Sequence, residues 1–311
     1  MGQIPTFIIN GFLDSGKTSF IINTFENDGF GSRGKTLLVI CEEGEVEYSQ
    51  EVLSRYNIST FVISSEKEFN SKAFDKAIKE CQPNRIVIEM NGMWDINKLK
   101  FPGVCRLAQL LLFIDFTTFG LYFNNMRQRM VDMMKVSDII VFNRVNNPQD
   151  LSPYQVNVKM INSQAQFLIM DENFEAMEAY EDPLPYNIEA EVIKIEDKDF
   201  GRFYIDTFDN KERYEGKIVE LNGLVILSKQ LLENTCIVGR KVMTCCSDDI
   251  QLYGHLCNNL MGLKLKNNSW IHLIAKITFE YSEEYEEEEL VFVPIKIESI
   301  QPIKNQVLDF R

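Results

Sequence analysis

The chain has 311 residues, of which 45% are hydrophobic and 25% are charged, and both shares are ordinary for a globular protein. Its 32 basic and 46 acidic residues give a net charge of −14, which opposes nonspecific binding to nucleic acid or to an anionic membrane surface. No apolar run reaches the roughly 18 residues of a membrane-spanning helix. These values argue against an embedded membrane protein and allow two domains with a sizeable core.

Residues 6–19, with the sequence TFIINGFLDSGKTS, combine an apolar run, a glycine-bounded loop and the start of helical spacing. The loop fits Gly-x-x-x-x-Gly-Lys-Thr, the pattern of a P-loop that binds nucleotide phosphates between a strand and a helix. Its glycines can turn successive backbone N–H groups toward a phosphate, and the helix adds its positive end. We therefore predict a phosphate site rather than a plain strand–helix turn. The candidate residues are Gly11, Asp14, Ser15, Gly16, Lys17, Thr18 and Ser19.

Two side chains of this loop carry specific chemistry. Lys17 places a cation on the β and γ phosphates, and the Thr18 hydroxyl is placed to ligate Mg²⁺.

Because the strand and loop are under way by residue 7, we expect no signal peptide and a cytoplasmic protein whose seven cysteines stay reduced.

Apolar runs alternate with helical periodicity from the loop to about residue 180. This alternation predicts a mostly parallel sheet covered by helices on both faces, the α/β architecture of a P-loop domain over residues 1–180. We expect strands at 36–41, 59–63, 85–90, 110–114, 138–142 and 166–170. We expect helices at 49–56, 67–80, 117–134 and 153–161.

Several functional candidates directly follow predicted strands, and ligands of parallel sheets bind at the carboxyl ends of the strands. Glu89 is the best candidate for a carboxylate that holds Mg²⁺ or a Mg²⁺-bound water opposite Thr18. Gly92 would let a backbone N–H group approach the γ-phosphate, and Glu42 would serve the nucleotide or Mg²⁺. Without its context, the pattern Glu-x-x-Gly also fits a simple strand-ending turn.

The segment 143–146 follows the predicted strand 138–142, where a guanine-reading loop would lie. Such loops commonly read Asn-Lys-x-Asp, and their aspartate accepts hydrogen bonds from the base. Here Arg144 replaces the lysine and Asn146 replaces the aspartate. An amide offers one acceptor and one donor group, so it cannot reproduce both contacts of the carboxylate. Asn143 and Arg144 are candidate nucleotide contacts, and the base preference stays open.

The pattern changes after a linker at 180–187, which holds two prolines and shows no periodicity. Residues 188–311 are rich in alternating and β-branched stretches and predict a small all-β, OB-like barrel. Its expected strands are 191–195, 203–208, 215–227, 236–246, 250–256, 269–281 and 290–300, with a helical signal only near 229–234. The acidic run 283–289 is expected to be a solvated hairpin tip, with a cation-attracting or partner-binding loop as the alternative.

Seven cysteines in such a chain indicate thiols, a metal site or plain core packing. Cys245 and Cys246 are adjacent, with Cys236 upstream and His255 and Cys257 downstream. Cys245, Cys246, His255 and Cys257 could close on Zn²⁺ or another transition metal. No Cys-x-x-Cys pair occurs, so reduced strand cysteines are the alternative. Both histidines of the chain lie in this half, which argues against a Ser-His-Asp triad.

Four stretches of the first half, 9–18 (INGFLDSGKT), 41–46 (CEEGEV), 86–92 (IVIEMNG) and 138–144 (DIIVFNR), occur in the order of a known family. Together they resemble the CobW-type GTPases, which are nucleotide-dependent metal chaperones related to the hydrogenase and urease maturation GTPases. The resemblance covers about residues 1–170 and implies GTP binding, slow GTP hydrolysis and a link to transition-metal supply. The family's Cys-x-Cys-Cys metal motif is absent, because Cys81 is the only cysteine between residues 42 and 104.

The second half carries the stretches 214–217 (YEGK), 238–249 (VGRKVMTCCSDD) and 269–271 (SWI). These stretches resemble the soluble domain of the YcgQ-type proteins, the DUF1980 group, which accompany a predicted membrane permease. The resemblance covers roughly residues 190–305 and implies an OB-like barrel with a permease as partner.

These patterns predict a protein that binds and slowly hydrolyses GTP with Mg²⁺ and that delivers or senses a transition metal, acting with a permease or a metal-accepting protein. Lys17 and the loop would hold the phosphates, and Glu42 and Gly92 would sense the γ-phosphate. The alternative is a nucleotide-gated adaptor with negligible turnover and no metal transfer. Oligonucleotide binding by the barrel is a third option, which the acidic charge disfavours. A homodimer is a candidate assembly.

Overall fold

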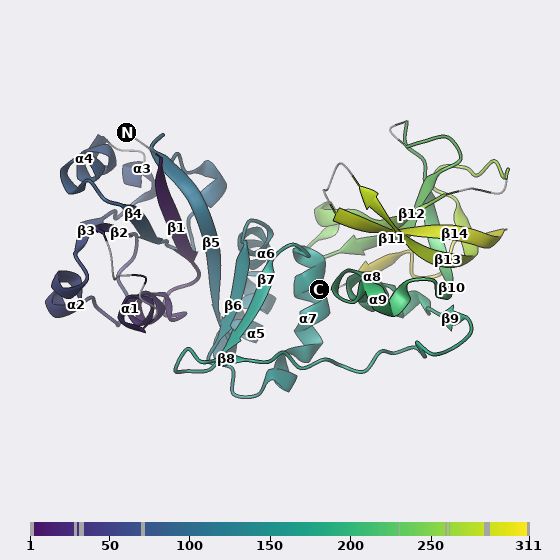
Figure 1. Cartoon of the computed structure of the whole chain (residues 1–311), viewed down its shortest axis with the longest axis horizontal. Helices are drawn as coiled ribbons and strands as arrows, with labels where there is room; N and C mark the ends of the chain where they lie inside the picture. Colours follow the sequence, from purple (N-terminus) through teal and green to yellow (C-terminus); the bar gives the residue numbers. More distant parts are fainter. Residues whose placement is uncertain are drawn as a thin grey trace. The chain divides into compact units, whose positions relative to one another are not determined.

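The computed structural model describes residues 3–27, 30, 34–69, 72–229, 231–258, 260, 262–282 and 287–309. Two compact units make up the chain, and each is described by itself (Figure 1). The first unit extends to Leu151 and includes Gln164–Tyr180, and the second consists of Ser152–Ser163 and the chain from Glu181 onward. Helix α7 (Ser152–Ile161) therefore belongs to the second unit, whereas the sequence analysis assigned it to the first.

The first unit is built on an eight-stranded sheet in the order β3-β2-β4-β1-β5-β6-β7-β8. All neighbouring strands pair in parallel except β7 and β8, which confirms the predicted mostly parallel α/β fold. The strands are β1 (Ile4–Asn10), β2 (Thr36–Ile40), β3 (Ile58–Val62), β4 (Arg85–Glu89), β5 (Cys105–Asp115), β6 (Ile139–Asn143), β7 (Gln166–Met170) and β8 (Ala176–Met177).

Helices connect most of these strands. They are α1 (Lys17–Asn27), α2 (Gln50–Arg55), α3 (Glu66–Phe69), α4 (Lys72–Cys81), α5 (Phe116–Asn125) and α6 (Arg127–Lys135), with 3₁₀ turns at Ile96–Lys98 and Pro148–Leu151. The predicted helix 117–134 is divided into α5 and α6, because Met126 leaves helical geometry with φ −129° and ψ 35°. The predicted helix 67–80 likewise corresponds to α3 and α4.

Each face of the sheet has its own core, and β1 contributes to both. Ile8 packs in one cluster with Phe69 and Phe74 from α3 and α4. The next residue, Ile9, packs in the opposite cluster with Phe25 of α1. Parallel strands with helical crossovers are buried on both faces of the sheet. This packing holds in place the carboxyl ends of the strands, which the polar candidate residues follow.

The second unit contains a mostly antiparallel sheet whose strands close into a ring. Pairing runs from β10 to β11, β12, β14, β13 and back to β10, and β12–β14 is the parallel pair in this ring. The ring closure agrees with the predicted barrel-like β architecture. The strands are β9 (Ile193–Lys194), β10 (Ile218–Ile226), β11 (Cys236–Met243), β12 (Ile250–Cys257), β13 (Trp270–Ser282), β14 (Glu287–Ile300) and β15 (Val307–Asp309).

Besides α7, this unit contains helices α8 (Phe200–Asp209) and α9 (Lys211–Tyr214) and 3₁₀ turns at Asp197–Asp199 and Ser247–Asp249. The predicted strand 203–208 is therefore wrong. Phe200, Phe203 and Thr207 are buried on α8 at helical spacing, and a short apolar run fits either period. The helix expected near 229–234 is absent from the described residues of that stretch.

The predicted hairpin tip at 283–289 lies outside the described residues over 283–286. On either side of it, Ser282 and Glu287 pair across β13 and β14. In the part of the chain that the structure describes, no helix has the length and apolar character to cross a membrane.

Candidate functional site

The loop between β1 and α1 has three residues with positive φ angles, a backbone conformation that favours glycine. Gly11 and Gly16 have φ angles of +147° and +98°, and Asp14 has +59°. A Cβ atom at Gly11 would lie 2.3 Å from the carbonyl oxygen of Phe113, and one at Gly16 would lie 2.3 Å from Asn143 Nδ2. Glycine is therefore required at both positions by conformation and by space.

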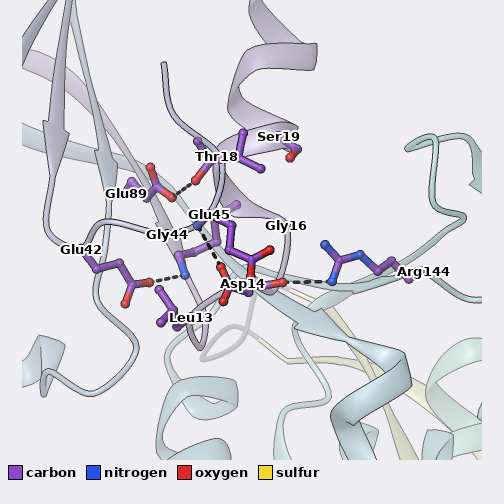
Figure 2. A pocket seen from close by; sticks show the side chains of 12 residues that line it. Leu13, Asp14, Gly16, Thr18, Ser19, Glu42, Gly44, Glu45, Glu89 and Arg144 are labelled. Carbon is purple, nitrogen blue, oxygen red and sulfur yellow. Dashed lines mark hydrogen bonds and ion pairs between the residues drawn. The ribbon is translucent and has the colours of Figure 1, made fainter. Parts of the chain in front are cut away.

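Lys17 begins α1 and points into this loop with only 3% of its surface exposed. Its Nζ donates to the carbonyl oxygens of Gly11 (3.0 Å) and Phe12 (2.8 Å). It also forms an ion pair with Glu42, which follows β2; the dashed line at Glu42 in Figure 2 marks this pair. Burial raises the pKa of Glu42, and the Lys17 charge opposes that rise. The Lys17 ammonium group thus lies inside the loop and is paired with the Glu42 carboxylate.

Thr18 and Glu89 meet beside Lys17. Thr18 Oγ1 donates to Glu89 Oε1 at 2.5 Å (Figure 2), and the Tyr48 hydroxyl donates to Glu89 Oε2 at 2.6 Å. Glu89 is 3% exposed, so its carboxylate is buried and has a donor at each oxygen. Burial raises the pKa of the Cys41 thiol to about 12, with the Glu42 and Glu89 charges adding to the rise, so Cys41 is a neutral thiol next to these groups.

The residues after β4 approach the phosphate loop closely. A Cβ atom at Gly92 would lie 2.3 Å from the carbonyl oxygen of Gly11 and 2.9 Å from the nitrogen of Phe12. Arg129 of α6 donates through Nε to the Gly92 carbonyl at 2.7 Å and also donates to the carbonyl of Trp94. Gly92 is therefore held between the loop and α6, and no side chain fits at this position.

The end of β6 supports the same loop from another side. Asn143 is 1% exposed, and its Nδ2 donates to the carbonyl oxygen of Ser15 at 3.1 Å. Arg144 Nη1 donates to the carbonyl oxygen of Asp14 at 3.0 Å and to Asp115 Oδ2 at 2.6 Å. The two predicted nucleotide contacts of this segment thus brace the loop. Two residues further on, Asn146 is exposed.

The predicted nucleotide contacts therefore meet at one edge of the sheet. Ser15 is buried in the loop, and an adjoining cavity of about 410 Å³ shares Thr18, Glu42 and Glu89 with the loop cavity. The loop cavity is shown in Figure 2. It is lined by Leu13, Asp14, Gly16, Lys17, Thr18, Ser19, Glu42, Gly44, Glu45, Val46, Glu89 and Arg144.

Two residues of this site escape the sequence reasoning. Asp115 ends β5 and caps α5 by accepting from the backbone nitrogen of Thr117 at 2.8 Å, besides its pair with Arg144. Its place at the carboxyl end of a strand is a signal that could have identified it. Tyr48 gives no such signal, because it lies in the connection before α2 and its partner belongs to a strand 41 residues away.

In the second unit, the adjacent thiols lie in the turn between β11 and β12. Cys245 Sγ is 3.7 Å from Cys246 Sγ and donates to Asp249 Oδ2 at 3.4 Å. Both cysteines are half-buried. Burial raises the pKa of Cys245 to about 12, and its hydrogen bonds to Cys246 and Asp249 add to the rise.

His255 and Cys257 belong instead to the core of the ring. The His255 ring stacks on Tyr204 with centroids 4.9 Å apart, its Nε2 lies 3.3 Å from Thr207 Oγ1, and burial lowers its pKa to about 3. Cys257 lies opposite Cys236 across β11 and β12, and both are fully buried.

The structure does not bring the four expected metal ligands together. Within the described ranges, no group of three or more His, Cys, Asp or Glu side chains can hold a metal ion. The physical reason is the two-residue alternation of β12, which turns His255 and Cys257 into an apolar interior, while Cys245 and Cys246 lie beyond the end of β11.

The sheet order, the loop and the cation within it define a P-loop nucleotide-binding domain. A family model described as "CobW/HypB/UreG, nucleotide-binding domain" matches residues 5–169, which is more than half of the chain, so the chain belongs to this family of P-loop GTPases. A second model, the DUF1980 C-terminal domain, matches residues 159–307. Both resemblances drawn from the sequence motifs are confirmed by these matches.

A search of curated proteins finds no match. Among solved structures, the hydrogenase maturation factor HypB from Archaeoglobus fulgidus is 20% identical over 54% of this chain and 81% of its own, with a TM-score of 0.39. A Zn(II)-bound triple mutant of the YjiA GTPase is 12% identical over 95% of each chain, with a TM-score of 0.45. The family assignment therefore rests on the two matched models.

Proposed function

We propose that the first unit binds GTP together with Mg²⁺ and hydrolyses it slowly. The observation that carries this proposal is the convergence of Lys17, Thr18 and Glu89 on one cavity beside a glycine-bounded loop. These are a cation, a hydroxyl and a carboxylate, the three groups that a Mg²⁺–nucleotide needs from a P-loop site. Membership of the CobW/HypB/UreG family supports hydrolysis as the reaction.

The phosphates would take the place that Glu42 now occupies at Lys17 Nζ. A carboxylate and a phosphate compete for the same cation, and the phosphate also gains the loop N–H groups and the positive end of the 11-residue helix α1. Displacement of Glu42 would transmit the arrival of nucleotide to the segment 42–48. We propose that Glu42 senses the phosphates in this way.

The oxygen donors beside Lys17 fit Mg²⁺, which prefers hydroxyl, carboxylate and water ligands. Thr18 Oγ1 and Glu89 Oε1 lie 2.5 Å apart, and Glu89 is buried, so both groups are already in place. Thr18 and Glu89 would hold the ion, directly or through its water, together with phosphate oxygens. When bound, the ion would neutralise charge that develops on the phosphates.

Gly92 would contribute its backbone N–H group near the γ-phosphate. Its close approach to Gly11 and the hydrogen bond from Arg129 Nε to its carbonyl oxygen support this role, because they fix the peptide beside the loop. Movement at Gly92 would be passed to α6 through Arg129. Slow turnover is what the resemblance to CobW-type GTPases implies.

The base would be read by the segment after β6. Arg144 and Asn143 hold this segment against the phosphate loop, and the exposed Asn146 follows. The amide oxygen of Asn146 can accept from one guanine N–H group, whereas a carboxylate accepts from two. We therefore propose a preference for GTP over ATP that is weaker than that of an Asn-Lys-x-Asp loop.

For the second unit we propose an OB-like ring whose thiol-bearing turn contacts metal cargo. Its strand order, with β12 and β14 in parallel, supports the OB-like assignment. Cys245 and Cys246 would supply two of the four ligands that Zn²⁺ takes, and a permease or a metal-accepting protein would supply the others.

A nucleotide-gated adaptor without metal transfer is the second candidate function. The engagement of His255 and Cys257 in the core favours it, because these side chains are committed to packing. Metal content measured by mass spectrometry on anaerobically purified protein separates the two candidates. Near-stoichiometric Zn²⁺ that is lost in the Cys245→Ser/Cys246→Ser variant supports delivery, and no metal in either protein supports the adaptor.

Phosphate release from GTP and from ATP, measured with and without Mg²⁺, tests the proposed activity. We expect slow, Mg²⁺-dependent release that is faster with GTP and is lost in Glu89→Ala. Binding of GTP with no release would favour the adaptor, and failure to bind either nucleotide would contradict the proposal.

A further inference from the structure

Tyr48 precedes helix α2 and reaches the proposed Mg²⁺ side of the nucleotide site. Its hydroxyl donates to Glu89 Oε2 at 2.6 Å, while Thr18 Oγ1 donates to Glu89 Oε1 at 2.5 Å. Each oxygen of this buried carboxylate therefore has an O–H donor, and the two donors come from different elements. A carboxylate held at both oxygens has lost most of its freedom to rotate.

The Tyr48 hydroxyl is a permanent donor in this arrangement. An ordinary tyrosine phenol has a pKa of about 10, well above neutral pH. The phenol therefore keeps its proton throughout the neutral range, and a neutral phenol can donate to Glu89 without adding charge to the site. Tyr48 thus directs the carboxylate and leaves its negative charge available to a cation.

The backbone at Tyr48 is fixed by the helix that follows it. Ser49 caps α2, since its Oγ accepts from the backbone nitrogen of Val52 at 3.2 Å, and Leu53 of α2 is buried in the core on the α1 face of the sheet. At its other end, the segment 42–48 contacts Lys17 through Glu42. One short segment therefore contacts the proposed phosphate-binding lysine through Glu42 and the proposed Mg²⁺ ligand Glu89 through Tyr48.

We propose that Tyr48 is a positioning residue that fixes Glu89 for Mg²⁺ binding, an inference that rests on the proposed nucleotide function. Because the Thr18 hydroxyl donates its hydrogen bond to Glu89, the lone pairs of the Thr18 oxygen stay available to the cation. Without the Tyr48 hydroxyl, Glu89 Oε2 loses its donor and the carboxylate can turn away. Mg²⁺ affinity then falls, while the phosphate contacts of Lys17 stay in place.

The test is the Tyr48→Phe variant, which removes one hydroxyl and keeps the ring. Binding of a fluorescent GTP analogue is measured over a range of Mg²⁺ concentrations and also with Mg²⁺ chelated. We expect the Mg²⁺ concentration at half-saturation to rise about tenfold or more, as for other groups that orient a metal ligand, with metal-free binding unchanged. Tyr56→Phe, at the other end of α2, is the matched control and should behave as wild type.

Two outcomes separate this inference from the function on which it rests. If the wild-type protein binds no GTP analogue, the proposed function fails and the role of Tyr48 fails with it. If the wild type shows Mg²⁺-dependent binding and Tyr48→Phe has the same half-saturation, only the role of Tyr48 is overturned.

A second comparison distinguishes positioning from a general effect on folding. In a Glu89→Ala background, Tyr48→Phe should cause no further loss of Mg²⁺ affinity, because its only proposed route to the ion is through Glu89. An equal loss in both backgrounds would contradict the inference. Thermal unfolding shows whether each variant folds. If the Glu89→Ala variants do not fold, the Mg²⁺ half-saturation of the single Tyr48→Phe variant decides the outcome.

Discussion

The nucleotide site of the first unit and the thiol-bearing turn of the second relate to the sequence in opposite ways. Lys17, Glu42 and Glu89 are far apart in the chain, yet they meet because β1, β4 and β2 are successive neighbours in a parallel sheet. His255 and Cys257 are close to Cys246 in the chain but belong to a different environment, the core of the ring. Strand direction and side-chain alternation, rather than spacing, decide which residues form a site.

The largest expected effect is the loss of nucleotide affinity when Lys17 of the first unit is replaced. Lys17→Ala removes the cation proposed for the phosphates and leaves Glu42 half-buried without its partner. Truncating one member of a buried charge pair in a binding site typically costs enough to reduce nucleotide affinity about 100-fold or more. Equilibrium binding of GTP measures this loss. Lys76→Ala, an exposed lysine paired with Glu80 on α4, is the control, and wild-type affinity in Lys17→Ala would contradict the account.

The close approach at Gly92 gives the next effect. Gly92→Ala places a Cβ atom 2.3 Å from the Gly11 carbonyl oxygen, so the backbone must move. We expect a loss of about 1–3 kcal/mol in the free energy of unfolding, together with weaker GTP binding. Urea denaturation measures the first change. Gly103→Ala, where a Cβ atom meets nothing within 4 Å, should lose far less, and equal losses in the two variants would disprove this packing.

Buried His255 in the second unit predicts that the free energy of unfolding depends on pH. Burial lowers the pKa of folded His255 from the ordinary value of 6.5 to about 3. The contribution of neutral His255 to the free energy of unfolding is therefore full above pH 6.5 and is lost as the pH falls toward 3. The expected slope is up to about 1.4 kcal/mol per pH unit, or about 2 kcal/mol at pH 5. Urea denaturation of His255→Phe at several pH values should show this slope removed. A slope equal to that of the wild type would mean that His255 is protonated in the folded ring as readily as in the unfolded chain, and would contradict its burial.

The smallest effect compares two cysteines of the second unit. Cys257→Ser buries a hydroxyl in the ring core and should cost about 1 kcal/mol or more in the free energy of unfolding. Cys245→Ser, on the half-buried turn, should change it by only a few tenths of a kcal/mol. Denaturation of the two variants in reducing buffer makes the comparison. The reverse order would place the structural thiol in the turn.

The sequence predicts the first unit well because each of its signals has a local cause. Gly11 and Gly16 report a backbone that only glycine adopts, and Glu89 follows an apolar run that is buried on both faces. The segment 203–208 is predicted as a strand but lies within α8, since a short, largely apolar run fits either period. Only packing against the ring decides between them.

Tyr48 and the thiols show where single-sequence reasoning reaches its limit. The partner of Tyr48 is defined by the fold of the segment 42–48, which carries no periodic pattern. The expected ligand set of Cys245, Cys246, His255 and Cys257 rests on residue type and spacing along the chain. Placement of these residues depends on the end of β11 and the register between β11 and β12, and neither can be read from cysteine positions.

Equilibrium titration of the purified wild-type chain with GTP, in excess Mg²⁺ and again with Mg²⁺ chelated, tests whether the first unit is a Mg²⁺-dependent nucleotide-binding domain. We expect saturable binding of one nucleotide per chain that is tighter when Mg²⁺ is present, because Lys17 is proposed to bind the phosphates and Thr18 and Glu89 to bind the ion. Absence of saturable binding, or binding that Mg²⁺ leaves unchanged, would contradict this expectation.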